Sequence, residues 1–256
     1  MEKAIIYQIF TRLFGNTNTT RKHNGTLTDN GCGKLNAFTP AVLRRIKELG
    51  ATHVWYTGVI RHATTTDYTR YGIPRQHPAV VKGNAGSPYA ITDYYDIDPD
   101  LATNVEKRMN EFESLVKRTH KAGLKMIIDF VPNHVARQYK STAKPKGIAD
   151  FGENDNTGMQ FSPQNNFYYC PEQSFAAKID LYHGEELPYE EFPAKATCND
   201  CFGNRPGRND WYETVKLNYG VDYCDAGGVS THFSPTPDTW KKMLDILLFW
   251  AGKGVD

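Results

Sequence analysis

The sequence predicts an α/β fold in which parallel strands alternate with helices. Two observations support this prediction: a unit of helix followed by strand occurs three times after a first strand, and the strands are apolar on both faces. Such strands are typical of parallel sheets that helices cover. A third observation concerns function, because two very long connections follow the second and third strands.

The first strand and the first helix–strand unit have clear boundaries. Residues 4–10 form the first predicted strand. The first helix covers residues 39–50, because Thr39 can cap it, Pro40 suits the first helical position and a glycine ends it. Residues 52–56 follow as a short strand of β-branched and aromatic residues.

The same pattern returns twice. Residues 104–123 begin with an asparagine cap, carry an apolar stripe and end at a glycine, and residues 125–131 then form an almost continuously apolar strand. Residues 236–252 repeat the helix, and residues 254–256 begin a fourth strand. The predicted order is therefore β-α-β-α-β-α-β.

This order fits two architectures, the open doubly wound sheet and the closed barrel. A doubly wound nucleotide-binding protein carries a glycine-rich turn after its first strand, but residues 11–16 contain one glycine and no phosphate cradle. The sequence therefore favours the barrel.

The connections between strands are uneven and suggest the domain organisation. The connection after the third strand, from about residue 132 to 235, is large enough for a small domain. Long connections at the C-terminal ends of strands lie on the face where barrel enzymes build their active sites. We expect residues 1–132 to form the first part of a barrel, residues 133–235 an inserted domain, and residues 236–256 the continuation of the barrel.

Composition excludes few classes of protein. The 256 residues are 39% hydrophobic with a formal charge of +1, which indicates a globular protein without net bias toward nucleic acid or anionic membranes. No segment reaches the roughly 18 consecutive apolar residues of a membrane span. The first seven residues lack the apolar run of a signal peptide, but a removed leader would leave no trace, so the cellular compartment stays open.

Four of the five cysteines fall in one irregular stretch, at positions 170, 198, 201 and 224. Cys198 and Cys201 have the spacing of a zinc half-site, but no second close pair follows. We therefore expect free or locally paired thiols, with structural zinc as the alternative.

Residues 129–134 read Asp-Phe-Val-Pro-Asn-His at the C-terminal end of the third predicted strand. This motif resembles the first signature region, Asp-x-Val-x-Asn-His, of the α-amylase family of glycoside hydrolases (family 13). Residues 7–14, 89–99 and 253–256 also resemble conserved segments of that family. The resemblance implies the N-terminal half of a (β/α)8 TIM barrel with an inserted B domain after strand 3.

The resemblance also implies roles for three residues in substrate binding. His134 would donate a hydrogen bond to a sugar hydroxyl, and Tyr89 would stack under the same sugar ring, because a flat aromatic face suits the apolar face of a pyranose. Asp129 would orient neighbouring polar groups at the mouth of the strand. The plainer alternatives are a histidine that hydrogen-bonds to the backbone and a tyrosine that packs in the core.

Calcium is the one metal that the resemblance suggests. Asn133 matches a position where many family members place a calcium ligand. Lys216, however, stands where calcium-binding members often have Asp, and its ammonium group would repel a divalent cation. We therefore expect no certain cofactor and regard Asn133 chiefly as a structural hydrogen-bonding residue, with a calcium ligand as the alternative.

The resemblance implies hydrolysis of α-glucosidic bonds in starch, glycogen or maltooligosaccharides by a retaining double displacement. The nucleophile and the acid/base are expected beyond Asp256, so we expect none of the catalytic carboxylates in this chain and no activity from it alone. The alternatives are a carbohydrate-binding or scaffold protein without catalysis, and a transglycosylase or a sucrose- or trehalose-directed enzyme. The sequence leaves the oligomeric state open.

Overall fold

The computed structural model describes residues 3–182 and 184–256. Met1, Glu2 and His183, which belong to the predicted first barrel part and insertion, lie outside the described residues. The central sheet consists of β1 (Ile6–Phe10), β2 (His53–Thr57) and β5 (Lys125–Ile128), in the order β1-β2-β5. Both strand pairs are parallel, so the predicted parallel sheet is confirmed.

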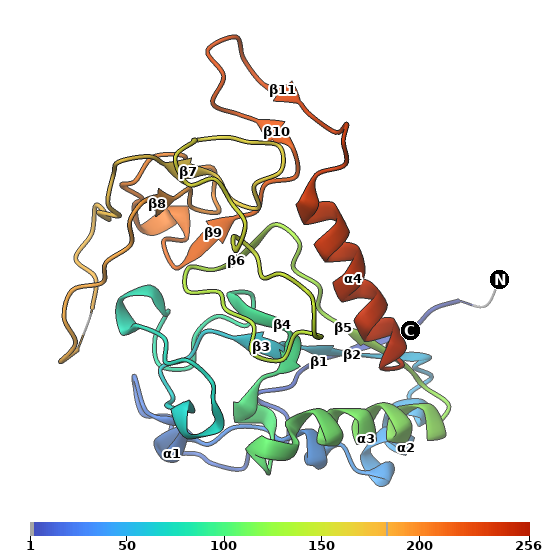
Figure 1. Cartoon of the computed structure of the whole chain (residues 1–256). Helices are drawn as coiled ribbons and strands as arrows, with labels where there is room; N and C mark the ends of the chain where they lie inside the picture. The colour runs from blue at the N-terminus through green and yellow to red at the C-terminus, as the bar shows by residue number, and fades with distance from the viewer. Residues whose placement is uncertain (1–2, 183) are drawn as a thin grey trace.

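Helices α2 (Pro40–Glu48) and α3 (Arg108–Lys121) cover one face of this sheet (Figure 1). The Thr39 side chain caps α2 as predicted, by accepting a hydrogen bond from the backbone of Val42. Helix α4 (Asp238–Gly252) runs beside the sheet toward the C-terminus. Short helical turns connect these elements: α1 at Leu27–Asn30 and 3-10 turns at Leu35–Ala37, Thr69–Tyr71, Pro78–Val80, Pro99–Leu101, Val105–Lys107 and Arg208–Asp210.

The main core lies between the sheet and helices α2 and α3. Tyr56 of β2 and Met126 of β5 are fully buried on this face, as are Leu43 of α2 and Phe112 of α3. The Tyr56 hydroxyl lies 2.7 Å from the hydroxyl of Thr119, which satisfies the polar end of a buried ring. Apolar burial on this face therefore fixes the helices on the sheet.

The opposite face of the sheet is open. Ile6 and Phe10 of β1 project from it with 51% and 38% of their surface exposed. In a closed barrel this face would be the interior, and further strands would cover it. The exposed apolar side chains match the expectation that the described strands form part of a (β/α)8 barrel.

The strands differ from the prediction in several places. The strand expected over residues 125–131 ends at Ile128, because Asp129 bonds to β2 and the turn that follows β2. Residues 254–256 are not assigned as a strand, although the backbone of Asp256 donates to the Met126 carbonyl at 3.0 Å beside β5. The long connection after β2 contains an antiparallel pair that we did not predict, β3 (Ile60–His62) with β4 (Ile91–Ile97).

Buried charges hold this β3–β4 pair in place. Arg61 contacts Asp93 at 3.1 Å and Asp96 at 2.9 Å, and Arg108 of α3 binds both oxygens of Asp96. The pattern continues just after β4, where His62 lies 2.9 Å from Asp98. Each of these carboxylates thus has a cationic partner from another element.

Asp100 extends the same network to the first strand. It accepts a hydrogen bond from Arg12, which follows β1, at 2.6 Å and one from the Tyr68 hydroxyl at 2.5 Å. Lys34 donates to its backbone carbonyl. The network therefore joins the loop after β1 to the long connection between β2 and α3.

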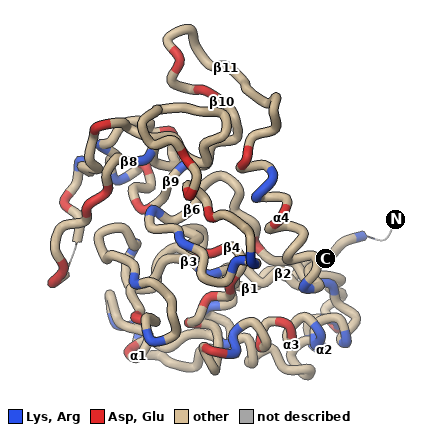
Figure 2. The backbone as a smooth tube through the Cα atoms, in the orientation of Figure 1, with Lys and Arg blue, Asp and Glu red and all other residues tan. Residues whose placement is uncertain are grey.

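The segment predicted as an insertion contains short strands that pair with one another. These are β6 (His134–Ala136) with β9 (Thr214–Lys216), β7 (Tyr169–Cys170) with β8 (Ala194–Lys195), and β10 (Val221–Asp222) with β11 (Ser230–Thr231). All three pairs are antiparallel and lie on one side of the parallel sheet (Figure 1). Figure 2 shows charges of both signs interspersed along the chain. None of the helices in residues 3–182 and 184–256 is long and apolar enough to span a bilayer.

The buried pair of His62 and Asp98 makes the stability of the fold depend on pH. Burial alone would lower the pKa of His62, but the Asp98 carboxylate outweighs burial and raises the pKa above 6.5. The pair stabilises the fold where His62 is charged and Asp98 is ionised, and this stabilisation is lost as pH rises through the raised pKa of His62 in the folded state.

We predict that His62→Gln lowers the free energy of unfolding by about 3–5 kcal/mol near pH 6, because it leaves Asp98 buried without its partner. The difference from wild type should shrink as pH rises toward 9. Urea unfolding at several pH values measures this difference. His23→Gln, at an exposed residue, is the control and should leave stability unchanged. A gap that stays constant with pH would contradict the prediction.

Candidate functional site

Asp129 joins the C-terminal ends of β5 and β2. One carboxylate oxygen accepts a hydrogen bond from Trp55 Nε1 at 2.6 Å, and the other accepts one from the backbone of Gly58, also at 2.6 Å. Burial raises the pKa of Asp129 above its ordinary value, and the two hydrogen bonds offset part of this effect. Both carboxylate oxygens therefore hold neighbouring groups, the Trp55 ring and the Gly58 backbone, in place.

Gly58 is suited to this contact by its backbone conformation. Its φ of +77° lies in the left-handed region, and a Cβ atom there would approach Pro88 Cβ to 2.9 Å. Pro88 is the residue before Tyr89, so Gly58 lets the segment that carries Tyr89 approach the end of β2. The absence of a side chain at Gly58 therefore lets Tyr89 lie near Asp129 at the C-terminal ends of the parallel strands, the part of the molecule that we call the rim.

Tyr89 is 45% exposed and precedes the buried strand β4. With Trp55 and Asp129 it lines a pocket of about 370 Å³ whose other walls come from β1, β5 and the residues after β5. The remaining lining residues are apolar: Ile6, Ile127, Ile128, Phe130 and Val131. An exposed ring beside a carboxylate at the end of parallel strands can hold a sugar by stacking.

His134 lies beside Tyr89 but does not line the pocket. Only 6% of its surface is exposed, and the edge of the Trp211 ring packs against it. Its Nδ1 is 3.1 Å from Cys198 Sγ and 3.4 Å from the side-chain nitrogen of Asn133. The structure thus surrounds the His134 imidazole with Cys198, Asn133 and Trp211, outside the pocket that Tyr89 lines.

The surroundings of His134 keep the imidazole neutral. Burial lowers its pKa to about 4, the contact with Tyr89 opposes this shift, and the charges of Lys216 and Lys82 add to it. At neutral pH the ring therefore carries one N–H and can donate one hydrogen bond.

A thiol and an ion pair lie near Asn133. The Asn133 side-chain amide donates to Cys198 Sγ at 3.0 Å, and Lys216 forms an ion pair with Asp200 at 2.6 Å. Calcium prefers oxygen ligands in a site of negative charge, whereas here the amide is bonded to sulfur and the carboxylate is paired with an ammonium group. The described residues contain no group of three or more His, Cys, Asp or Glu side chains that could hold a metal.

The cysteine side chains of the insertion contact different groups. Cys198 faces His134, Cys170 donates to the Phe202 carbonyl at 3.2 Å, and Cys201 faces the Gly203 carbonyl. All five cysteines are free thiols. The structure therefore agrees with the expectation of free thiols in this stretch.

Sequence reasoning missed several residues of this site, namely Trp55, Gly58, Cys198 and Trp211. Trp55 was recognisable only as a strand residue, although its position opposite Ile127 in the sheet places it on the open face. Cys198 and Trp211 reach His134 from 64 and 77 positions away in irregular segments, so no periodic pattern reveals them.

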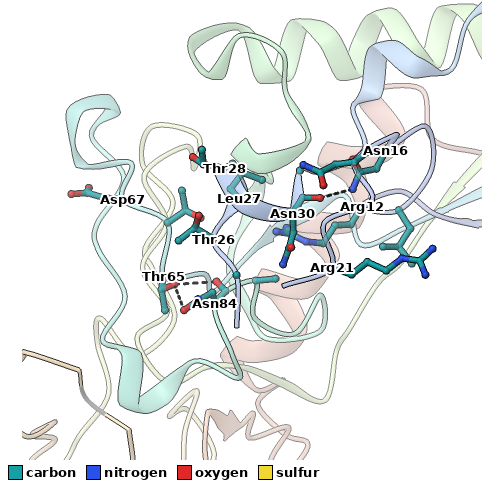
Figure 3. A pocket seen from close by; sticks show the side chains of 16 residues that line it. Arg12, Asn16, Arg21, Thr26, Leu27, Thr28, Asn30, Thr65, Asp67 and Asn84 are labelled. Atoms are coloured by element: carbon teal, nitrogen blue, oxygen red, sulfur yellow. Dashed lines mark hydrogen bonds between the residues drawn. The ribbon is translucent and has the colours of Figure 1, made fainter. Parts of the chain in front are cut away.

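A second pocket, of about 750 Å³, lies between the loop after β1 and the loop after β3 (Figure 3). Most of its polar side chains bond to the same two loops, as Asn16 does to the Asn30 carbonyl and Thr65 to Asn84. Few hydrogen-bonding groups are left for a ligand. This pocket is therefore a weaker candidate than the rim that carries Tyr89.

Comparisons with known proteins agree with this geometry. A family model described as "Alpha amylase, catalytic domain" matches residues 8–256. The trehalose-6-phosphate hydrolase of Bacillus subtilis (strain 168) is 32% identical over the whole chain, which covers 34% of that protein. The human amino acid transporter heavy chain SLC3A1 is 41% identical over 175 residues, which cover 66% of this chain and 20% of that protein.

The fold is also similar to solved structures. An alpha-amylase from Lactobacillus plantarum matches 99% of this chain and 37% of its own length, with a TM-score of 0.50 and 22% identity. The chain thus spans about a third of the length of the curated relatives that match all of it.

We predict that Asp129→Asn destabilises the rim. An amide has one acceptor oxygen, so either Trp55 Nε1 or the Gly58 backbone N–H would face an NH2 group and lose its partner. We expect the free energy of unfolding to fall by about 1–3 kcal/mol in urea titrations. The control is Asp225→Asn at an exposed carboxylate, which should change stability little. Equal losses in the two variants would refute this role of Asp129.

Proposed function

Because the chain belongs to the alpha-amylase family, we propose that it supplies the sugar-binding rim of a glycoside hydrolase that cleaves α-glucosidic bonds in starch, glycogen or maltooligosaccharides. The single observation that carries this proposal is the pocket in which exposed Tyr89 and Asp129 meet at the C-terminal ends of parallel strands. The names of matched relatives, among them a trehalose-6-phosphate hydrolase and a maltase, support an α-glucosidic substrate.

In this proposal each rim residue has a separate task. The Tyr89 ring stacks under one glucose unit, and Asp129 holds Trp55 and Gly58 so that the wall of the pocket keeps its shape. His134 contributes a hydrogen-bond donor to a sugar hydroxyl. No step uses calcium, because the groups around Asn133 are poor ligands for it.

We propose a retaining double displacement for the bond cleavage. This reaction needs two carboxylates about 5 Å apart, one as nucleophile and one as acid/base. Asp129 is unsuited to either task, because both of its oxygens accept internal hydrogen bonds. We therefore propose that the catalytic pair comes from later barrel strands, and that residues 1–256 alone do not hydrolyse maltooligosaccharides.

A second candidate function is carbohydrate binding or scaffolding without catalysis. One observation favours it: the matched relative SLC3A1 is named as the heavy chain of an amino acid transporter. In such a protein the pocket beside Tyr89 would bind sugar, and no product would form.

Product assays on the full-length protein, with starch, maltooligosaccharides and sucrose in parallel, distinguish these functions. We expect release of glucose or maltose, with the anomeric proton of the first product in the α configuration by NMR. Binding without product would favour the scaffold function. Product of inverted configuration would exclude the double displacement.

We also predict that Tyr89→Ala weakens binding of maltooligosaccharides by roughly tenfold, because loss of the stacking ring costs about 1–2 kcal/mol. Isothermal titration calorimetry on the same full-length protein measures this change. Tyr182→Ala, at another exposed tyrosine outside the pocket, is the control and should bind as wild type does. Unchanged affinity in Tyr89→Ala would remove Tyr89 from the site.

A further inference from the structure

The thiol of Cys198 contacts both residues of the Asn133–His134 motif. Only 2% of Cys198 is exposed, and its Sγ lies 3.0 Å from Asn133 Nδ2 and 3.1 Å from His134 Nδ1. The Asn133 amide also lies 3.4 Å from the same ring nitrogen. The thiol thus reaches the histidine from 64 positions further along the chain.

The hydrogen-bond donors near His134 Nδ1 determine whether this nitrogen carries a proton. The amide nitrogen of Asn133 only donates, and it directs one hydrogen at the sulfur. The hydrogen-bond acceptor found within reach of the thiol among the described residues is His134 Nδ1, at 3.1 Å. A thiol that donates to it requires that Nδ1 carries a lone pair.

The second ring nitrogen of His134 then carries the proton. A neutral imidazole carries one proton, so a lone pair on Nδ1 leaves that proton on Nε2. The line of hydrogen bonds therefore runs from the Asn133 amide through the Cys198 thiol to His134 Nδ1, and Nε2 is the donor of the ring.

Charged groups nearby fit a neutral ring with one proton. Lys216, opposite His134 in the β6–β9 pair, is bound to Asp200, and Lys82 is bound to Glu213 at 2.8 Å. These ammonium groups oppose a second proton on the ring. Burial raises the pKa of the Cys198 thiol, so the thiol keeps its proton and acts as a donor rather than as a nucleophile.

We propose that Cys198 is a positioning residue that holds His134 in the tautomer with its proton on Nε2. With the proton on Nδ1 instead, the single N–H of the ring would face the thiol, and Nε2 could not donate a hydrogen bond to a ligand. The proposal rests on the proposed function only in assigning the Nε2 donor to a sugar hydroxyl. Cys198 thereby controls which nitrogen of His134 is the hydrogen-bond donor.

Nitrogen NMR of the full chain labelled with 15N-histidine tests the tautomer directly, with His134→Gln used to assign the signals. In wild type we expect one His134 nitrogen to resonate as protonated Nε2 and the other as unprotonated Nδ1. Cys198→Ala should move the two signals toward each other as the tautomers mix. Cys198→Ser keeps a donor at this position and should restore the wild-type pattern.

Cys170→Ala is the matched control, because Cys170 is an equally buried thiol whose proton goes to the Phe202 carbonyl. It should leave the His134 signals unchanged. Wild-type signals from an Nδ1-protonated ring, or identical signals in wild type and Cys198→Ala, would overturn the proposal. If Cys198→Ala does not fold, the wild-type spectrum and Cys198→Ser still decide the tautomer.

Binding of maltooligosaccharides to the full-length protein separates this proposal from the proposed function. We expect Cys198→Ala to bind about threefold to tenfold more weakly than wild type and Cys198→Ser to bind within about twofold of it. A tautomer that responds to Cys198 in a protein that binds no sugar would support the positioning role and refute the function. If the protein binds sugar but the His134 tautomer does not change in Cys198→Ala, the proposed function would be supported and the positioning role refuted.

Discussion

The pairing of buried carboxylates in and after β4 constrains most of this structure. Asp93, Asp96, Asp98 and Asp100 are each almost fully buried, and such charges are tolerated in an interior only when cations and hydrogen bonds compensate them. Their partners come from the loop after β1, from β3 and from α3. Elements far apart in sequence must therefore meet at β4, and Tyr89 is placed because it lies two residues before this strand.

The rim of the sheet depends on a second, smaller set of contacts. Asp129 ties β5 to β2, and the glycine that it binds allows the Pro88–Tyr89 segment to come close. Because the carboxylate network fixes the far end of the same segment, Tyr89 is held from both sides. A stacking residue gains affinity when it is already rigid before its ligand arrives, since less conformational freedom is lost on binding.

Local chemistry allowed the sequence to predict the parallel sheet and its helices. Caps and terminators such as Thr39 and Gly50 act within a few residues, so they can be recognised without knowledge of the fold. The β3–β4 pair escaped prediction because its strands are stabilised by distant cations such as Arg108 rather than by an alternating apolar pattern. The Asp129–His134 motif identified the rim, but its partners Trp55 and Cys198 depend on tertiary contacts that no local pattern encodes.

The open face of the parallel sheet has a consequence for engineering. The side toward α2 and α3 is packed internally, whereas Ile6 and Phe10 on the other side meet solvent, as do Trp240, Leu244 and Leu248 along α4. One face of the sheet is thus packed, and the other presents exposed apolar side chains. A polypeptide that carries complementary apolar strands would gain free energy by covering this face, so pairing two such polypeptides is a way to build a reporter whose signal depends on their assembly.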